Sequence, residues 1–362
     1  MKKNMLYLGN FSPKTSFAAL NRAMGICKLF FLHGYTSNIV VHDFDDSFLH
    51  DKYIKENKIN VLKVSINKKK FYFSYKWIIK LIEGIGDLKV VVLYNYPSIP
   101  AIKITKYCKK KGIKVIGDIT EWYDTSNVSL LFKPIKYFDT KKRMKSVNFK
   151  MDGLILISNY LLDYYKNRKS LIKIYPLMDY GLRNWNNNKI AASGNYKICY
   201  AGIAGNNKDD LLSFVSFLKR EEVSNVDLII VGVINQDVEN ELKASGINYC
   251  YHGLLDHEQT IDILTECDCQ VIFRRPSRMN NAGFPTKFAE SICLGVPVIA
   301  TDISDIQSFS SDYVYIIDAN HENLQLFLDN SRKRAATVDN SFFYSNKYLE
   351  EFGNFITAIE KK

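Results

Sequence analysis

Residues 283–300, Gly-Phe-Pro-Thr-Lys-Phe-Ala-Glu-Ser-Ile-Cys-Leu-Gly-Val-Pro-Val-Ile-Ala, decide the fold. Pro285 restricts the approach to a helix that starts with Thr286 as its N-cap, and Gly295 ends that helix. The apolar residues 297–300 follow as a buried strand. We therefore expect a loop–helix–strand unit of the kind that builds parallel α/β sheets.

The same unit offers a site for an anion. The first turn of a helix has unsatisfied N–H groups and a partial positive charge, which suit a phosphate. Gly283 allows a ligand to approach the backbone closely. Glu290, one turn further on, can accept hydrogen bonds from two neighbouring hydroxyls of a ribose. Many Rossmann-like units fit this description, so these features alone do not specify the ligand.

Outward from this unit, short β-branched runs alternate with amphipathic stretches along the whole chain, which predicts doubly wound parallel sheets. The polar, Asn-rich segment 180–195 interrupts the alternation. We predict two Rossmann-like α/β domains with a cleft between them, 1–182 on the acceptor side and 195–341 for the donor. A linker at 183–194 joins them, and a helical segment at 342–362 packs back on the first domain.

The expected elements follow from these periodicities. The predicted strands are 5–9, 37–41, 89–94, 113–116, 153–157, 197–201, 226–231, 248–251, 270–273 and 297–300. The predicted helices are 17–33, 101–111, 160–167, 209–218, 238–245, 261–267, 287–294 and 346–360.

Composition narrows the class of protein. The 362 residues are 47% apolar, which is ample for two packed cores and unlike a disordered chain. The apolar run after Met1 is too short for a signal peptide, and no stretch approaches the roughly 20 residues of a membrane span. We therefore expect a cytoplasmic protein. The seven cysteines are odd in number and form no Cys-x-x-Cys pair, which predicts reduced, mostly buried thiols.

Charge is distributed unevenly along the chain. Residues 1–190 hold 34 Lys/Arg and 14 Asp/Glu, a balance of +20, whereas residues 191–362 hold 15 and 24, a balance of −9; together they give the net charge of +11. A basic first half predicts an anionic partner, either nucleic acid or the anionic cytoplasmic leaflet of a membrane. Segments 68–77 and 141–145 carry the densest basic clusters, and the first of them mixes lysines with aromatic residues. An ordinary solvated face is the alternative.

Residues 281–290, Asn-Ala-Gly-Phe-Pro-Thr-Lys-Phe-Ala-Glu, resemble the donor-site motif of family 4 glycosyltransferases, which have the two-domain GT-B fold. The resemblance is strongest to the bacterial capsule, exopolysaccharide and O-antigen branch. Segments 118–124, 151–161, 175–179 and 251–258 extend it over nearly the whole chain in the same order. It implies transfer of a sugar from a nucleotide-diphosphate sugar to a glycan acceptor, with retention of anomeric configuration.

The resemblance also implies a set of site residues. Lys208 takes the place of the lysine that neutralises the donor diphosphate, and Glu121 lies near a position where many relatives have a residue that contacts the sugar or acceptor. Arg274 is assigned from its own position: it follows the predicted strand 270–273 beside the phosphate loop, where a guanidinium suits a polyanionic donor, so it is expected to contact a phosphate. We assign catalytic roles to these three. A solvated position for Lys208 and a capping role for Glu121 are the alternatives. The predicted donor-binding residues are Gly9, Asn10, Gly202, Gly205, Lys208, Arg274, Gly283, Phe284, Pro285, Thr286, Lys287 and Glu290.

Two positions depart from the family pattern. Ala282 stands where relatives have a first glutamate that contacts hydroxyls of the donor sugar, so the contact to the sugar is expected to differ from that of relatives. Ile203 stands where an arginine is common, and Arg274 is the candidate to supply that charge. The site is therefore expected to be modified but functional.

The expected reaction needs no cofactor. Cations around the leaving diphosphate would lower the barrier to transfer electrostatically. An Asp-x-Asp triplet is the metal-binding motif of the other major glycosyltransferase fold. The triplet at 43–45 in this chain lies far from the donor motif, so we predict metal-independent transfer. The expected partners are a nucleotide-sugar donor, a lipid-linked or glycan acceptor, and an anionic inner-leaflet surface that holds the protein peripherally at the membrane. A nucleotide-sugar epimerase of the same fold is the alternative enzyme. A nucleic-acid-binding protein is disfavoured because no recognised motif for that role is present.

Overall fold

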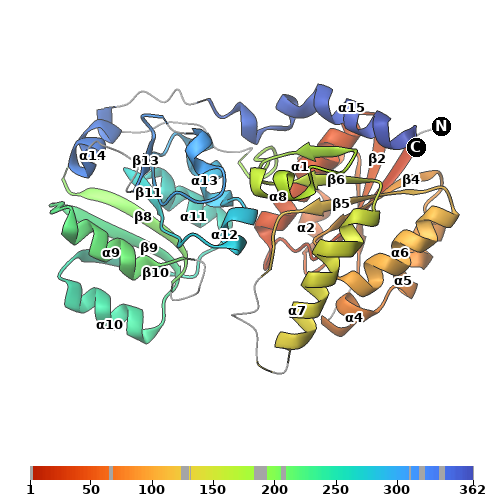
Figure 1. Cartoon of the computed structure of the whole chain (residues 1–362). Helices are drawn as coiled ribbons and strands as arrows, with labels where there is room; N and C mark the ends of the chain where they lie inside the picture. The colour runs from red at the N-terminus through yellow and green to blue at the C-terminus, as the bar shows by residue number, and fades with distance from the viewer. Residues whose placement is uncertain are drawn as a thin grey trace. The chain divides into compact units, whose positions relative to one another are not determined.

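The computed structural model describes residues 3–64, 68–123, 130, 132–182, 194–204, 209–309, 311–317, 323–333 and 339–361. The chain divides into two units. Unit 1 comprises residues 1–181, 282–284 and 341–362, and unit 2 comprises residues 182–281 and 285–340. Each unit contains one parallel β-sheet with helices packed against it (Figure 1).

Unit 1 has a seven-stranded sheet in the order β3-β2-β1-β4-β5-β6-β7, with every pair parallel. Its strands are β1 (Lys3–Leu8), β2 (Tyr35–Val41), β3 (Ile59–Lys63), β4 (Leu88–Tyr94), β5 (Lys114–Ile119), β6 (Gly153–Leu156) and β7 (Leu171–Lys173). Its helices are α1 (Phe17–Leu32), α2 (Asp46–Leu49), α3 (Lys52–Glu56), α4 (Lys68–Phe73), α5 (Lys76–Gly84), α6 (Ser98–Lys110), α7 (Lys133–Lys142), α8 (Asn159–Tyr165) and α15 (Leu349–Glu360). A π-helical turn, Arg143–Val147, follows α7 directly.

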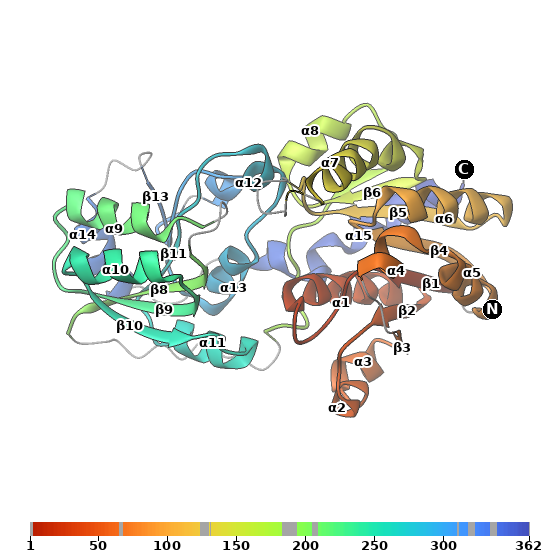
Figure 2. The ribbon, with the colours of Figure 1, turned by 90° about the horizontal axis from the view of Figure 1, so that it is seen from below.

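Both faces of the central strands β1, β4, β5 and β6 are buried, which is why these strands are largely apolar runs. Met5 and Tyr7 of β1 lie in the core that contains α1 and α15, where Phe30 meets Phe352 edge to face with ring centroids 5.0 Å apart. Leu6 alternates with them and is equally buried, toward the opposite face. Helix α15 thus belongs to the core of unit 1, beside α1 (Figure 2).

Unit 2 has a six-stranded sheet in the order β10-β9-β8-β11-β12-β13, again with every pair parallel. Its strands are β8 (Tyr196–Ile203), β9 (Val226–Val233), β10 (Asn248–Gly253), β11 (Cys269–Ile272), β12 (Val298–Ala300) and β13 (Val314–Ile316). Its helices are α9 (Leu211–Arg220), α10 (Gln236–Ser245), α11 (His257–Thr265), α12 (Arg278–Ala282), α13 (Thr286–Leu294) and α14 (Leu324–Lys333). The two sheets confirm the predicted α/β fold of two doubly wound, Rossmann-like domains.

Local chemistry explains where the structure differs from the sequence prediction. Helix α11 begins at His257, four residues earlier than expected, because Asp256 and Gln259 form a capping box. Helix α6 begins at Ser98 and contains Pro100 in its first turn, where a missing N–H costs nothing. Strands β3, β7 and β13 were not predicted, since runs of three to five residues give too weak a pattern.

The cysteines are mostly buried, as the sequence predicts. All seven are free, and Cys250 is the one that is exposed. Burial raises the pKa of the Cys27 thiol to about 12, so it stays protonated and packs as a small apolar side chain. None of the helices in the described part of the chain is both long and apolar enough to span a bilayer.

Candidate functional site

The candidate site lies at the carboxyl ends of β8 and β11 in unit 2, the edge where parallel α/β sheets bind ligands. Gly202 of β8 pairs with Gly232 of β9. A Cβ on Gly232 would come within 1.9 Å of the Gly202 carbonyl oxygen. The backbone φ of Gly232, +122°, is itself unfavourable for residues other than glycine. The glycine pair therefore allows the two strands to end in close contact beneath the site.

Replacing Gly232 with alanine is expected to destabilise unit 2 by about 2 to 3 kcal/mol, through backbone strain and overpacking together. Gly246 is a matched control because it also has positive φ, +74°, but open space around the Cβ position. Its alanine variant should cost about 1 kcal/mol. Urea unfolding of both variants measures the difference, and equal costs would contradict the close-packing explanation.

Three charged side chains meet at the edge of the sheet. Asp209 accepts hydrogen bonds from Arg274 Nε at 2.6 Å and from Lys287 Nζ at 3.0 Å. A Cβ on Gly202 would lie 2.8 Å from Lys287 Nζ and 2.9 Å from the Asp209 carboxylate, so a side chain there would displace the cluster. Two cations and one carboxylate leave a net charge of +1, and Arg274 and Asp209 are both more than nine-tenths buried.

Titration behaviour follows from this packing. Burial opposes ionisation of Asp209, but the charges of Lys287 and Arg274 outweigh it and hold the pKa of the carboxyl below its usual value. Burial, reinforced by the charge of Arg274, lowers the pKa of Lys287, although Asp209 acts against the shift. Burial has the opposite effect on Tyr200, because it disfavours the phenolate, and so it raises the pKa of that hydroxyl. The Tyr200 hydroxyl has no hydrogen-bond partner among the described residues. The cluster has an excess of positive charge and a buried hydroxyl donor, both suited to an anion.

The backbone of Arg274 is held in place by the side chain of Thr301. Its N–H donates to Thr301 Oγ1 at 2.9 Å, and the same hydroxyl donates to the Arg274 carbonyl at 2.7 Å. Arg275 behaves differently, because its side chain is 78% exposed and pairs with Asp210. The structure thus separates the two arginines: Arg274 faces the cluster and Arg275 the solvent.

Helix α13 corrects one expectation. Its N-cap is Pro285, without a side-chain cap, and Thr286 is the first helical residue instead of the N-cap. Proline fixes a backbone conformation that leads into the helix, so a capping hydroxyl is not used. Lys287, also in the first turn, would be repelled by the helix dipole and is stabilised there by Asp209.

Glu290 has a partner that the sequence analysis did not assign. His257 Nε2, in the first turn of α11, lies 3.1 Å from Glu290 Oε1. Both side chains are mostly buried, at 19% and 13% exposure. The pair fixes the direction of the carboxylate that the sequence assigns to ribose. Segment 251–258 extends the resemblance in the sequence, but nothing in its pattern indicates that His257 meets the donor motif.

Residues 282–284 of the donor motif belong to unit 1. Ala282, Gly283 and Phe284 are grouped with that unit, and the Ala282 carbonyl accepts a hydrogen bond from Ser158 Oγ at 2.9 Å. Phe284 packs on Tyr175 with ring centroids 4.9 Å apart. Ala282, which stands where an acid was expected, has no exposed surface. Gly205 and Lys208 lie outside the described residues.

The residues predicted from the first domain lie after β1 and β5. A Cβ on Gly9 would meet the Phe11 ring at 2.4 Å, so the glycine makes room for a core aromatic residue. The Asn10 carbonyl accepts a hydrogen bond from Ser16 Oγ. The Glu121 carbonyl accepts one from Arg143, whose guanidinium is buried. That contact removes Arg143 from the basic surface cluster expected at 141–145.

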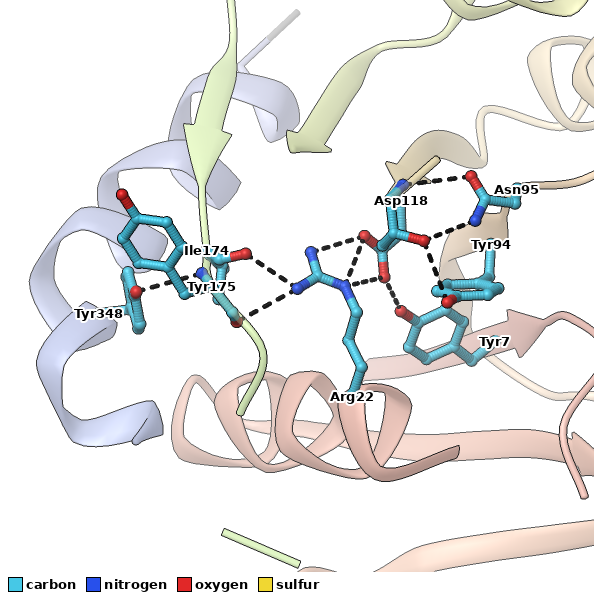
Figure 3. Close-up of polar contacts among 9 residues, drawn as sticks. Tyr7, Arg22, Tyr94, Asn95, Asp118, Ile174, Tyr175 and Tyr348 are labelled. Carbon is cyan, nitrogen blue, oxygen red and sulfur yellow. Dashed lines mark hydrogen bonds and ion pairs between the residues drawn. The ribbon is translucent and has the colours of Figure 1, made fainter. Parts of the chain in front are cut away.

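Asp118, the second-to-last residue of β5, belongs to a buried network (Figure 3). It forms an ion pair with Arg22 at 2.8 Å and accepts a hydrogen bond from the Tyr7 hydroxyl. Arg22 also donates to the carbonyls of Ile174 and Tyr175. The network joins α1, β5 and the chain after β7, so Asp118 supports the fold of unit 1.

Comparison with known proteins bears on the family and the fold. Residues 183–342 match the model of the family described as glycosyl transferases group 1, just under half of the chain. The whole chain is similar in structure to HepE of Anabaena, solved with UDP and glucose, with a TM-score of 0.61 and 11% identity over 99% of this chain and 98% of that one.

The fold is GT-B.

Two further GT-B structures support this assignment. The lipopolysaccharide outer core galactosyltransferase WaaB gives a TM-score of 0.65 and 13% identity over 98% of this chain and 99% of that one. Sucrose-phosphate synthase of Thermosynechococcus elongatus gives 0.64 and 11%, over 99% and 98%. At these identities the likeness establishes the fold alone. No curated protein sequence matches the chain.

Proposed function

We propose that this GT-B protein is a glycosyltransferase that moves a sugar from a nucleoside-diphosphate sugar to a glycan acceptor. The observation that carries the proposal is the Asp209–Arg274–Lys287 cluster with its net positive charge, at the ligand-binding edge of a domain that matches group 1 glycosyl transferases. HepE, which has the same fold, was solved with UDP, and this supports a nucleotide-sugar donor.

The proposed roles follow from the contacts. Arg274 and Lys287 bind the diphosphate, and Glu290, oriented by His257, binds the ribose hydroxyls. As the bond to the anomeric carbon breaks, the leaving diphosphate gains charge, and the two cations stabilise it more than they stabilise the intact donor. Lys208, Gly205 and Glu121 keep the roles that the resemblance gives them. Metal independence and retention of configuration are part of the proposal.

We further propose that the acceptor is lipid-linked and that the product is a bacterial surface polysaccharide. The +20 balance of residues 1–190 supports a peripheral location at the cytoplasmic face of an anionic membrane. WaaB, a lipopolysaccharide galactosyltransferase of the same fold, supports this class of product.

A thermal-shift panel of UDP-, GDP-, CMP- and dTDP-sugars tests the donor site. One nucleotide should stabilise the wild type selectively, and Glu290→Ala should abolish that shift because the ribose loses its acceptor. Glu258→Ala, on the exposed side of α11, is the matched control and should keep it. No shift with any donor would overturn the proposal. Conversion of the donor to an epimer without acceptor would favour the epimerase instead.

A further inference from the structure

Helix α7 turns its polar side toward the rest of unit 1. Thr140 is its one buried residue. Its single carboxylate, Asp139, accepts a hydrogen bond from the Ser98 N–H at 2.7 Å and so serves the start of α6. Lys136 extends over the Tyr123 ring, 4.9 Å from its centroid. A surface helix of a globular protein normally turns its apolar side inward, so α7 has the reverse arrangement.

The side of α7 that faces away from unit 1 is aromatic. Phe138 is 64% exposed, Tyr137 49% and Ile135 44%, and Phe132, which precedes the helix, is 62% exposed. Phe138 lies four residues after the exposed Pro134, at the spacing of one ridge on a helix. Several large apolar side chains exposed together on one short helix indicate a surface that contacts a partner.

Cations surround this aromatic ridge. Lys133, Lys141 and Lys142 are exposed on the helix, and Lys145 is exposed just beyond it. Because Asp139 is used at the start of α6, the described residues from Phe132 to Lys145 expose no carboxylate. The surface is therefore both apolar and positively charged.

Helix α4 extends the same region. Helices α4 and α7 both pack against α6 (Figure 2). Phe73, the last residue of α4, is 48% exposed. The two segments with the densest basic clusters, 68–77 and 141–145, thus belong to helices on either side of α6 in unit 1.

We propose that α7 is a membrane-docking helix for an anionic bilayer, with Phe138, Tyr137 and Ile135 in the interfacial layer and its lysines at lipid phosphates. An amphipathic helix with lysines beside aromatic residues is suited to that interface. A symmetric contact between two copies would instead place lysines against lysines, which is repulsive. The inference rests on the lipid-linked acceptor of the proposed function, because docking would bring unit 1 to that acceptor.

Co-sedimentation with vesicles tests the proposal. The full chain should bind vesicles of phosphatidylcholine mixed equally with phosphatidylglycerol, should lose binding as salt rises, and should bind pure phosphatidylcholine weakly. Phe138→Ser and the double variant Lys141→Gln/Lys142→Gln should each weaken binding about tenfold. Leu326→Ser is the matched control, because Leu326 is a 50%-exposed residue of α14 in unit 2, and it should bind like the wild type.

A fluorescent reporter locates the contact. The emission of Phe138→Trp should shift to the blue on anionic vesicles, whereas Leu326→Trp should not shift. Binding that is unchanged in the α7 variants, or equal on neutral vesicles, would overturn the proposal. So would light scattering that shows dimers of the wild type and monomers of Phe138→Ser. The nucleotide-sugar thermal shift is the independent check of the proposed function, since the α7 variants should retain it.

Discussion

Replacing Arg22 with leucine is expected to lower the free energy of unfolding of unit 1 by about 3 to 5 kcal/mol, the largest effect on stability that we predict. Arg22 and Asp118 are 3% and 0% exposed, and the change leaves a buried carboxylate without its cation. It also removes the donors to the carbonyls of Ile174 and Tyr175. Urea unfolding followed by tryptophan fluorescence measures the loss, since Trp77 and Trp122 lie in this unit.

Two controls separate this explanation from a general effect of removing charge. Lys14→Met breaks the exposed pair with Asp45 and should cost less than about 1 kcal/mol. In the double variant Arg22→Leu/Asp118→Leu no buried charge is left unpaired, so it should be more stable than Arg22→Leu alone. A double variant that is less stable than the single one would show that the packing of Arg22, and not its charge, is what matters.

Replacing Lys287 with methionine is expected to weaken binding of the donor nucleotide about 100-fold or more, and to lower the rate of transfer further. Methionine keeps much of the length of the side chain but removes the ammonium group from the cluster. The net charge of the cluster falls from +1 to zero, and Arg274 remains paired with Asp209. Isothermal titration with the nucleoside diphosphate measures the change in affinity, and a transfer assay at saturating donor measures the change in rate.

Lys243→Met is the control for the loss of a lysine. Lys243 is exposed and pairs with Glu239 on α10, so its variant should bind the nucleotide like the wild type. Asp209→Asn adds a test in the opposite direction, because it frees both cations and should strengthen binding of the diphosphate. Equal affinity of wild type and Lys287→Met would exclude this cluster as the diphosphate site.

The positions of secondary structure were largely predictable because they depend on local pattern. The helix–strand unit at 286–300 appears where its periodicity places it, and Gly295 ends α13 in the left-handed conformation that glycine permits. The start of that helix was misassigned by one residue because Pro285, and not Thr286, is the N-cap. Helix α7 was not predicted at all, since its apolar residues face outward and give no core-directed pattern.

The candidate site was predictable only in part. Lys287 and Glu290 were predicted from the motif and its resemblance, and Arg274 from its place after a predicted strand; the structure shows what surrounds them. Asp209 and His257 were not identified, because their partners are distant in sequence: Asp209 is 65 residues from Arg274, and His257 is 33 from Glu290. A hydrogen bond of this kind leaves no trace in periodicity or spacing.

The sequence by itself predicted the two α/β units, a division of the chain near residue 182, and the helix–strand unit at 286–300 that carries the proposed donor motif. Each of these depends on interactions within about twenty residues, which local pattern records. Only the tertiary structure decided that Asp209 joins Arg274 and Lys287, that Asp118 and Arg143 are buried in the support of unit 1, and that α7 faces outward. These depend on which side chains meet after the strands pair, and charge alone does not distinguish a buried arginine from an exposed one.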